Sequence, residues 1–145
     1  MLRSRHHKKI GLNTKVSRRI SEISPDDWNK IYPDVLEGYD FFKTLDESHL
    51  EQFSFYYIMV YNRKEPVGAA ACFLMDYSLD TSINGKLRRV TNAIKRLWPK
   101  VFSLKVLICG NPLSQGRMGL NGDPEAIVGV ILRRMEQIAK KKKAG

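Results

Sequence analysis

The sequence has few cysteines and no long apolar run. Only two cysteines, Cys72 and Cys109, occur among its 145 residues, and both lie in apolar stretches. Two thiols are too few for the disulfide framework of a small secreted domain, so we expect both to be free and buried. The longest apolar stretch, Val67–Met75, is about half as long as a membrane-spanning helix. The basic N-terminus lacks the apolar segment of a secretory signal, which favours a cytoplasmic protein.

The sequence also lacks the motifs of the common phosphate and metal sites. Neither GxxxxGK[ST] nor GxGxxG is present. His6 and His7 are adjacent but have no third ligand near them in the sequence, so we expect no metal site there. The length is that of one domain and no segment repeats. We expect a basic disordered arm over residues 1–15 and a single domain over residues 16–145.

Acidic residues are missing from one long part of the chain. Residues 81–122 hold eight Lys/Arg and no Asp/Glu, whereas residues 20–80 hold four Lys/Arg and twelve Asp/Glu. The net charge of +10 is therefore concentrated outside the first structured half. This asymmetry favours an anionic partner for the second half, such as a nonspecific polyanion. The alternative is that solvent-exposed helix faces are simply rich in lysine and arginine.

Apolar periodicity and turn residues predict the order of the secondary structure. Ser24 and Pro25 are typical of a helix start, and the polar residues 62–65 join two strands into an antiparallel hairpin. The expected elements are a strand at 16–23, helices at about 25–32 and 40–50, strands at 53–61 and 66–76, a basic helix at 86–98, a buried strand at 103–109, and a helix from Pro124 to about Lys141.

A glycine-rich loop before the last helix is the strongest candidate for a binding site. The apolar run LKVLICG ends at Gly110, and the segment NPLSQGRMGLNG that follows carries one charge, Arg117. Asp123 is a good N-cap and Pro124 suits the first helical position. A strand, a glycine loop and a helix N-terminus in that order form an anion cradle, because backbone N–H groups and the helix dipole face the ligand. We expect the loop 110–122 to bind a phosphate-bearing ligand such as a nucleotide or coenzyme A.

Four segments, in this order of elements, resemble a known family. They are DDWNKI, FFKTLDES, YYIMVYNRKEPVGAAACFLMD and LKVLICGNPLSQGRMGL. They resemble the first half of the predicted N-acyltransferases of the GNAT superfamily that are related to the Fem-type aminoacyl transferases, over about residues 20–143. The resemblance implies a truncated GNAT-like α/β (α+β) domain with a mixed sheet. It also implies transfer of an acyl group from acyl-CoA to an amine.

The resemblance implies an acyl-CoA site at the glycine-rich loop. In the superfamily the strand before the loop holds the pantetheine arm, and the loop binds the pyrophosphate through a [QR]xxGx[GA] pattern. The nearest match is QGRMGL at 115–120, in which the glycine comes one position late and Leu120 replaces the last small residue. The implied acyl-CoA-binding residues are Cys109, Gly110, Ser114, Gln115, Gly116, Arg117, Met118 and Gly119. No metal is implied.

Candidates for catalysis are weaker than the binding loop. An acyltransferase needs a base that takes the proton of the amine. Asp76 and Asp80, at the end of the second hairpin strand, are the nearest candidates, and the alternative is that they are solvated strand-end carboxylates. Cys109 is either a nucleophile or a small buried core residue.

The chain ends soon after the last predicted helix, where the family fold continues with further strands. We therefore expect an inactive or split N-terminal half that leaves the edge of strand 103–109 unpaired. A homodimer or a companion chain could cover that edge and the apolar stripe of the last helix, which comprises Ile127, Ile131, Met135 and Ile138.

Two other classes of function stay open. In one, the protein is a noncatalytic basic module whose helix 86–98 and lysine-rich ends hold RNA or an anionic membrane surface. Tyr56, Tyr57 and Tyr61 are then either aromatics that stack on bases or core residues of the strand. In the other, the chain is a nonfunctional gene fragment.

Overall fold

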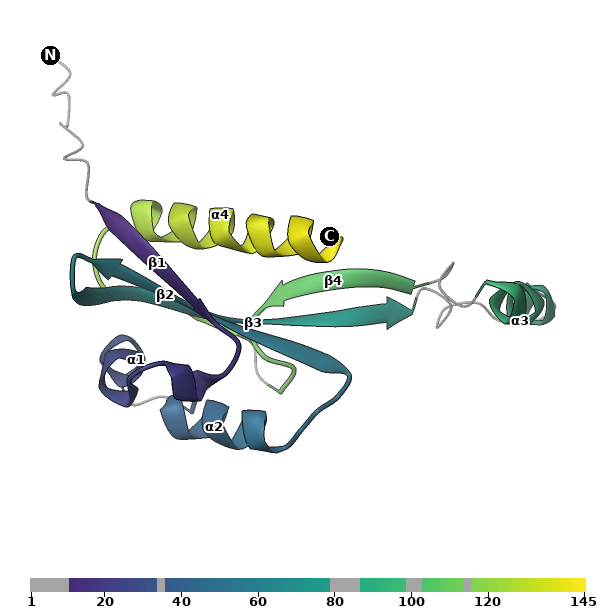
Figure 1. The fold of residues 1–145 in the computed structure, drawn as a ribbon, viewed down its shortest axis with the longest axis horizontal. Coiled ribbons are helices and arrows are strands. Elements are labelled where there is room, and N and C mark those ends of the chain that lie inside the picture. Colours follow the sequence, from purple (N-terminus) through teal and green to yellow (C-terminus); the bar gives the residue numbers. More distant parts are fainter. Residues whose placement is uncertain (1–10, 34–35, 79–86, 99–102, 114–115) are drawn as a thin grey trace, which may run out of the picture.

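The chain forms an antiparallel sheet with helices on both of its faces (Figure 1). The structure, a computed structural model, describes residues 11–33, 36–78, 87–98, 103–113 and 116–145. The described elements are β1 (Leu12–Ser17), the 3-10 helix η1 (Ile20–Glu22), α1 (Pro25–Ile31), α2 (Tyr39–Glu47), β2 (Phe53–Asn62), β3 (Glu65–Ser78), α3 (Leu87–Leu97), β4 (Ser103–Cys109), β5 (Met118–Leu120) and α4 (Pro124–Lys142).

The sheet is built around the long strand β3. Its strand order is β1-β2-β3-β4, and β5 pairs with the same edge of β3 as β4 does. The predicted hairpin is confirmed, since β2 and β3 pair antiparallel from Phe53 opposite Met75 to Asn62 opposite Glu65. The predicted mixed sheet is not seen, because every strand pair among the described residues is antiparallel.

One core lies between the sheet and the helices α1 and α2. Its centre is Trp28, whose ring stacks on Tyr32 at a centroid distance of 5.0 Å and meets Phe42 edge-on at 5.2 Å. Tyr57 of β2 meets the same indole ring edge-on at 5.7 Å. The side chains of Trp28 and Tyr57 are fully buried. Aromatic contacts of this kind fix α1 and α2 on one face of the sheet.

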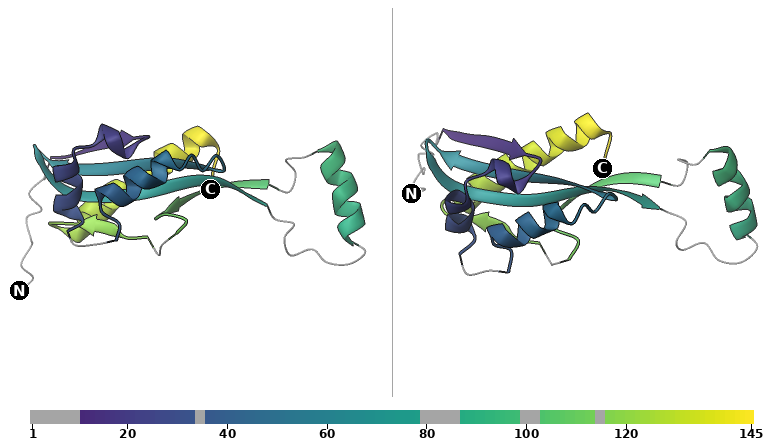
Figure 2. Two further views of the ribbon diagram at one scale, coloured as in Figure 1. Left: turned by 90° about the horizontal axis from the view of Figure 1, so that it is seen from below. Right: turned by 60° about the horizontal axis from the view of Figure 1, so that its bottom comes forward.

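A second core lies between the opposite face of the sheet and α4. Figure 2 shows α4 on the face of the sheet away from α1 and α2. Ile127, Ile131 and Ile138 of α4 are buried against β2 and β3. Gly68 of β3 permits the close approach, since a Cβ there would lie 2.3 Å from Cγ2 of Ile127. The protein's own sheet therefore covers these three residues of the α4 stripe, for which a homodimer or a companion chain was the expected cover.

The first strand is shifted from its predicted position. β1 begins at Leu12 and ends at Ser17, so its first residues fall within the segment expected to be an arm. The prediction of a strand up to residue 23 is wrong, because residues 20–22 form η1. The backbone N–H of Ile20 donates to the carboxylate of Asp46 at 2.7 Å, which turns the chain away from the sheet. Residues 1–10 lie outside the described part.

β4 is a partly exposed strand and not the buried strand that was predicted. Leu107 is buried in it, whereas Leu104 and Ile108 are 48% and 38% exposed. Part of its outer edge also has a partner, which corrects the expectation of an unpaired edge at Lys105 and Leu107. The N–H of Gly145 donates to the carbonyl of Lys105 at 2.9 Å, and the carbonyl of Gly145 accepts from the N–H of Leu107 at 3.1 Å. These two bonds have the pattern of a parallel pair, with α4 as the crossover between β4 and Gly145.

The predicted basic helix is confirmed as α3, but its apolar side is not buried. α3 lies beyond the ends of β3 and β4 and apart from the other helices (Figures 1 and 2). Val90, Leu97 and Trp98 are 57%, 73% and 66% exposed. Among the described elements, none packs extensively on α3.

Candidate functional site

The glycine-rich segment leaves the sheet and returns to almost the same place. At the end of β4, the N–H of Gly110 donates to the carbonyl of Ala71 at 2.7 Å. At the start of β5, Met118 lies opposite Ala70, the next residue along β3. β4 and β5 therefore form one interrupted strand. We call the described residues between the two halves, 110–113 and 116–117, the excursion loop.

The base of the excursion loop is closed by backbone contact. Gly116 has a φ of +65°, and a Cβ on it would lie 2.5 Å from Cα of Gly110. Gly110 itself has a φ of 123°. An L side chain at position 116 would therefore be strained and would force the two ends apart. Glycine is needed here to bring the two ends of the loop together.

The hydroxyl of Tyr32 holds the C-terminal end of the loop to the sheet. It accepts a hydrogen bond from the N–H of Gly119 at 3.0 Å. Its single proton lies between two carbonyls, that of Arg117 at 2.7 Å and that of Ala69 at 3.0 Å. Burial raises the pKa of Tyr32, so the hydroxyl stays protonated and keeps its donor. Tyr32, the residue directly after α1, thus links β3, β5 and the excursion loop.

A buried polar pair holds the N-terminal end of the loop. The side-chain amide of Asn111 donates to the carboxylate of Glu37 at 3.0 Å, and both residues are buried. The side-chain oxygen of Asn111 accepts from the N–H of Leu113 at 2.9 Å, which shapes the first turn of the loop. The indole N–H of Trp28 donates to the carbonyl of Glu37 at 3.3 Å. The loop is therefore tied to the connection between α1 and α2, on that face of the sheet.

The two thiols face each other where β4 ends. Cys72 and Cys109 are directly opposite in the β3–β4 register. The bond from Gly110 to Ala71 marks the neighbouring pair as hydrogen-bonded, so the cysteines occupy a non-hydrogen-bonded position, where side chains come closest. The Cys72 thiol donates a hydrogen bond that lowers the pKa of Cys109. The same bond, with burial, raises the pKa of Cys72. Both thiols are free, as predicted, but Cys109 is only half-buried.

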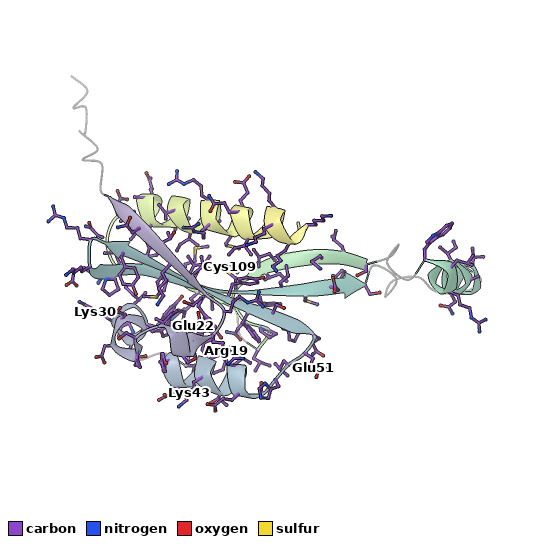
Figure 3. All side chains as sticks on the ribbon, in the orientation of Figure 1. Arg19, Glu22, Lys30, Lys43, Glu51 and Cys109 are labelled. Carbon is purple, nitrogen blue, oxygen red and sulfur yellow. The ribbon has the colours of Figure 1, made fainter. Side chains whose placement is uncertain are left out.

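Figure 3 shows Cys109 at the end of β4, on the side of the sheet that α4 covers. The excursion loop makes its polar contacts with Glu37 on the opposite side of the sheet. The side chain of Cys109 therefore lies on the α4 face of the sheet, and the polar contacts of the excursion loop lie on the α1 and α2 face. A ligand in the loop would lie next to the backbone of Cys109 rather than against its sulfur.

The predicted anion cradle is not assembled in the predicted way. The sequence places one loop directly before the last helix, but β5 separates the excursion loop from α4. The start of α4 is also filled by the protein itself. The carboxylate of Asp123 accepts from the N–H groups of Glu125 at 3.1 Å and Ala126 at 3.4 Å, which confirms the predicted N-cap. A phosphate would therefore have to find its donors in the excursion loop and not at the helix start.

The residues predicted to bind acyl-CoA do not all lie in the excursion loop. Arg117 is exposed at the end of the excursion loop, next to Gly116. Gly119 belongs to β5 and packs on α1, because a Cβ there would lie 2.2 Å from Cγ2 of Ile31. Ser114 and Gln115 lie outside the described residues.

The two candidate bases are not brought to the loop. Asp76 is exposed and lies opposite Lys105, four positions along β3 from Cys72. Four residues of strand span about 13 Å, so this carboxylate does not reach the end of β4. Asp80 lies outside the described residues.

Sequence reasoning missed Tyr32, Glu37 and Asn111. Tyr32 follows a helix and precedes Pro33, so its position suggests only a helix end. Glu37 lies in a short connection with no periodic pattern. Asn111 directly follows a glycine at the end of an apolar run, which is the usual signal for a side chain that shapes a turn, and it could have been found.

A hollow of about 570 Å³ lies elsewhere, between η1, the end of α2 and the start of β2. Its lining includes Arg19, Lys43 and Glu51, which Figure 3 labels on that side of the molecule. Cations and carboxylates are mixed there, so the hollow has no preference for an anion. Among the residues that the structure describes, none of the excursion loop lines this hollow.

Comparison with protein-family models, with curated proteins and with solved structures finds no match for this chain. Among the described residues, no helix is long and apolar enough to cross a membrane. Within the same residues, no group of three His, Cys, Asp or Glu side chains is placed to hold a metal ion.

Proposed function

We propose that this chain is an N-acyltransferase-like domain that binds acyl-CoA at the excursion loop and passes the acyl group to an amine. The observation that carries the proposal is the place of the loop. It lies at the carboxyl end of β4, and α4 brings Gly145 back beside β4 in the one parallel contact that the structure describes in this otherwise antiparallel sheet. In open parallel α/β sheets, ligands bind beyond the carboxyl ends of the strands.

The chemistry of the loop suits the phosphate-bearing end of coenzyme A. The loop holds glycines at both ends of its base, and its one described charge is the exposed Arg117. Residues 81–122 contain no carboxylate, and the carboxylate that lies against the loop, that of Glu37, accepts a hydrogen bond from Asn111. Gly145 occupies the N–H of Leu107 and the carbonyl of Lys105 on the outer edge of β4, so a pantetheine arm would have to pair with the part of that edge nearer the loop. Together these features support binding of the nucleotide at the loop and of the acyl arm along β4.

Acyl transfer to an amine also requires a group that takes a proton. Glu37 is the carboxylate that the structure holds against the excursion loop, through Asn111. Within this proposal Glu37 therefore replaces Asp76 as the candidate base. A chain that binds acyl-CoA but does not acylate an amine would be an inactive or split form of such an enzyme.

The test is a titration with acetyl-CoA and with a long-chain acyl-CoA, followed by the backbone amide shifts of the protein. We expect shifts centred on Gly116 and Gly119. Arg117→Ala should weaken the affinity about tenfold, the effect of one lost charge-assisted hydrogen bond. Arg133→Ala is the matched control, since Arg133 is an exposed arginine on α4. The proposal fails if no amide of the loop shifts, or if both substitutions weaken binding equally.

A further inference from the structure

α3 is an exposed helix with an apolar stripe and a cationic composition. Val90, Ile94 and Leu97 lie at the i, i+4 and i+7 positions of one helix face. The backbone N–H of Trp98 donates to the carbonyl of Ile94 at 2.7 Å, so Trp98 continues the helical geometry past Leu97. Val90, Leu97 and Trp98 are each more than half exposed. Large apolar side chains gathered on one exposed face mark a surface that binds something.

The charge around this stripe has one sign. Residues 86–98 contain five Lys/Arg and no Asp or Glu. Arg96 is exposed on the described part of the helix. The nearest described carboxylate along β3 is Asp76, which already lies opposite Lys105 in the register. The partner of the stripe must therefore be apolar where it meets Leu97 and anionic around it.

Exposed apolar side chains also occur on the strands at the end of the sheet nearest α3. Tyr77 and Leu104 are directly opposite across β3 and β4, on one face of the sheet, and each is 48% exposed. α3 lies beyond this end of the sheet in every view (Figures 1 and 2). A flat surface could therefore meet the helix without contact with α1, α2 or α4.

We propose that α3 docks on the surface of an anionic lipid bilayer, with Leu97 and Trp98 inserted among the acyl chains. An α-helix of 11 residues is about 16 Å long and cannot cross a hydrocarbon core of about 30 Å. It therefore lies in the plane of the interface. Basic amphipathic helices bind there because cations reach lipid phosphates while the apolar stripe leaves water. This inference is independent of acyl transfer.

RNA is the other polyanion that the charge alone would suit, and the structure disfavours it. Tyr56 and Tyr57, two of the tyrosines considered for base stacking, are buried in the core. An RNA backbone also offers no apolar phase for Leu97 and Val90. The membrane accounts for both the charge and the exposed apolar side chains.

The experiment measures binding of the full chain to phosphatidylcholine vesicles with and without phosphatidylglycerol. We expect binding only to the anionic vesicles, weakened by added salt. Leu97→Glu should lower the affinity at least tenfold, because the Leu side chain no longer leaves water. Arg96→Ala should lower it about fivefold, the effect of one cation near an anionic surface. The matched controls, Leu132→Glu and Arg133→Ala, change exposed residues of α4 and should leave binding unchanged.

Trp98 provides a second readout. The chain has two tryptophans, and Trp28 is fully buried. Brominated lipids should therefore quench only Trp98, and Trp98→Phe should abolish the quenching while vesicles still bind. The proposal is overturned if anionic vesicles do not bind or if the Leu97 and Leu132 variants behave alike. It is also overturned if an RNA homopolymer binds better than the vesicles, or if sedimentation shows a dimer that Leu97→Glu dissociates.

Discussion

Replacement of Tyr32 by phenylalanine should destabilise the protein by about 2–4 kcal/mol. The ring is kept, so its stacking on Trp28 survives, and only the hydroxyl is lost. The lost bond to the carbonyl of Arg117 costs about 1 kcal/mol, since that carbonyl belongs to an exposed residue and can turn to water. Loss of the bond from the N–H of Gly119 costs more, about 1–3 kcal/mol, because Gly119 is buried and its donor is left without a partner.

Urea denaturation monitored by tryptophan fluorescence measures this loss. The control is Tyr61→Phe, since Tyr61 donates to Asp27 at 3.0 Å in a less buried place. Its loss should cost less than about 1 kcal/mol, because both groups can then bind water. Hydrogen exchange of the Gly119 amide should accelerate in the Tyr32 variant alone. Equal destabilisation by the two substitutions would refute the role assigned to the Tyr32 hydroxyl.

Three further predictions concern the glycines, the thiols and the alkaline limit of stability. Gly119→Ala should destabilise the protein by about 1–3 kcal/mol, because the new methyl group overpacks against α1. Gly129→Ala is the control: a Cβ there would have nothing within 4 Å, so this change should stabilise α4 by up to about 1 kcal/mol. Urea denaturation compares the two variants. Cys72→Ala should raise the pKa of Cys109 by removing the donor of its hydrogen bond, so the pH profile of Cys109 alkylation by iodoacetamide should move to higher pH. Burial, followed by the bond to Asp27, raises the pKa of Tyr61 to about 12, so the stability from its protonated form is complete below pH 10 and lost as the pH rises toward 12. Unfolding measured across that range should show the loss, and Tyr61→Phe should reduce it.

Local signals were enough to predict the helices and the central hairpin. The proline at the first position of α1, the N-cap Asp123 and the polar turn at 62–65 act within a few residues, so a single sequence contains them. The same holds for α3, whose apolar positions recur at helical spacing. That spacing carries no information on whether the stripe is covered. The sequence therefore predicts the helix and not its exposure.

The interrupted strand could not be predicted because its cause is not local. β5 has three residues and no periodic pattern, and it forms because it continues the β3 edge that β4 leaves. Its N–H at Gly119 is held by Tyr32, 87 residues earlier in the chain. The parallel contact between Gly145 and β4 is equally remote. Contacts of this kind are decided by the assembled sheet, and a window of neighbouring residues does not contain them.

The spacing of the glycines has two physical explanations. The sequence therefore identifies the loop but places it directly before the last helix, where the structure has β5 between them. A glycine at φ above zero beside a strand end is typical of an anion site, and it is equally typical of a tight backbone approach. In this protein Gly116 closes the base of the excursion loop and Gly119 makes room for Ile31, so both have a packing role before any ligand is considered. An anion site in the excursion loop must therefore use donors that packing leaves free, and the exposed Arg117 is one such donor. A substitution at Arg117 tests binding without disturbing the fold, whereas a substitution at either glycine would change both.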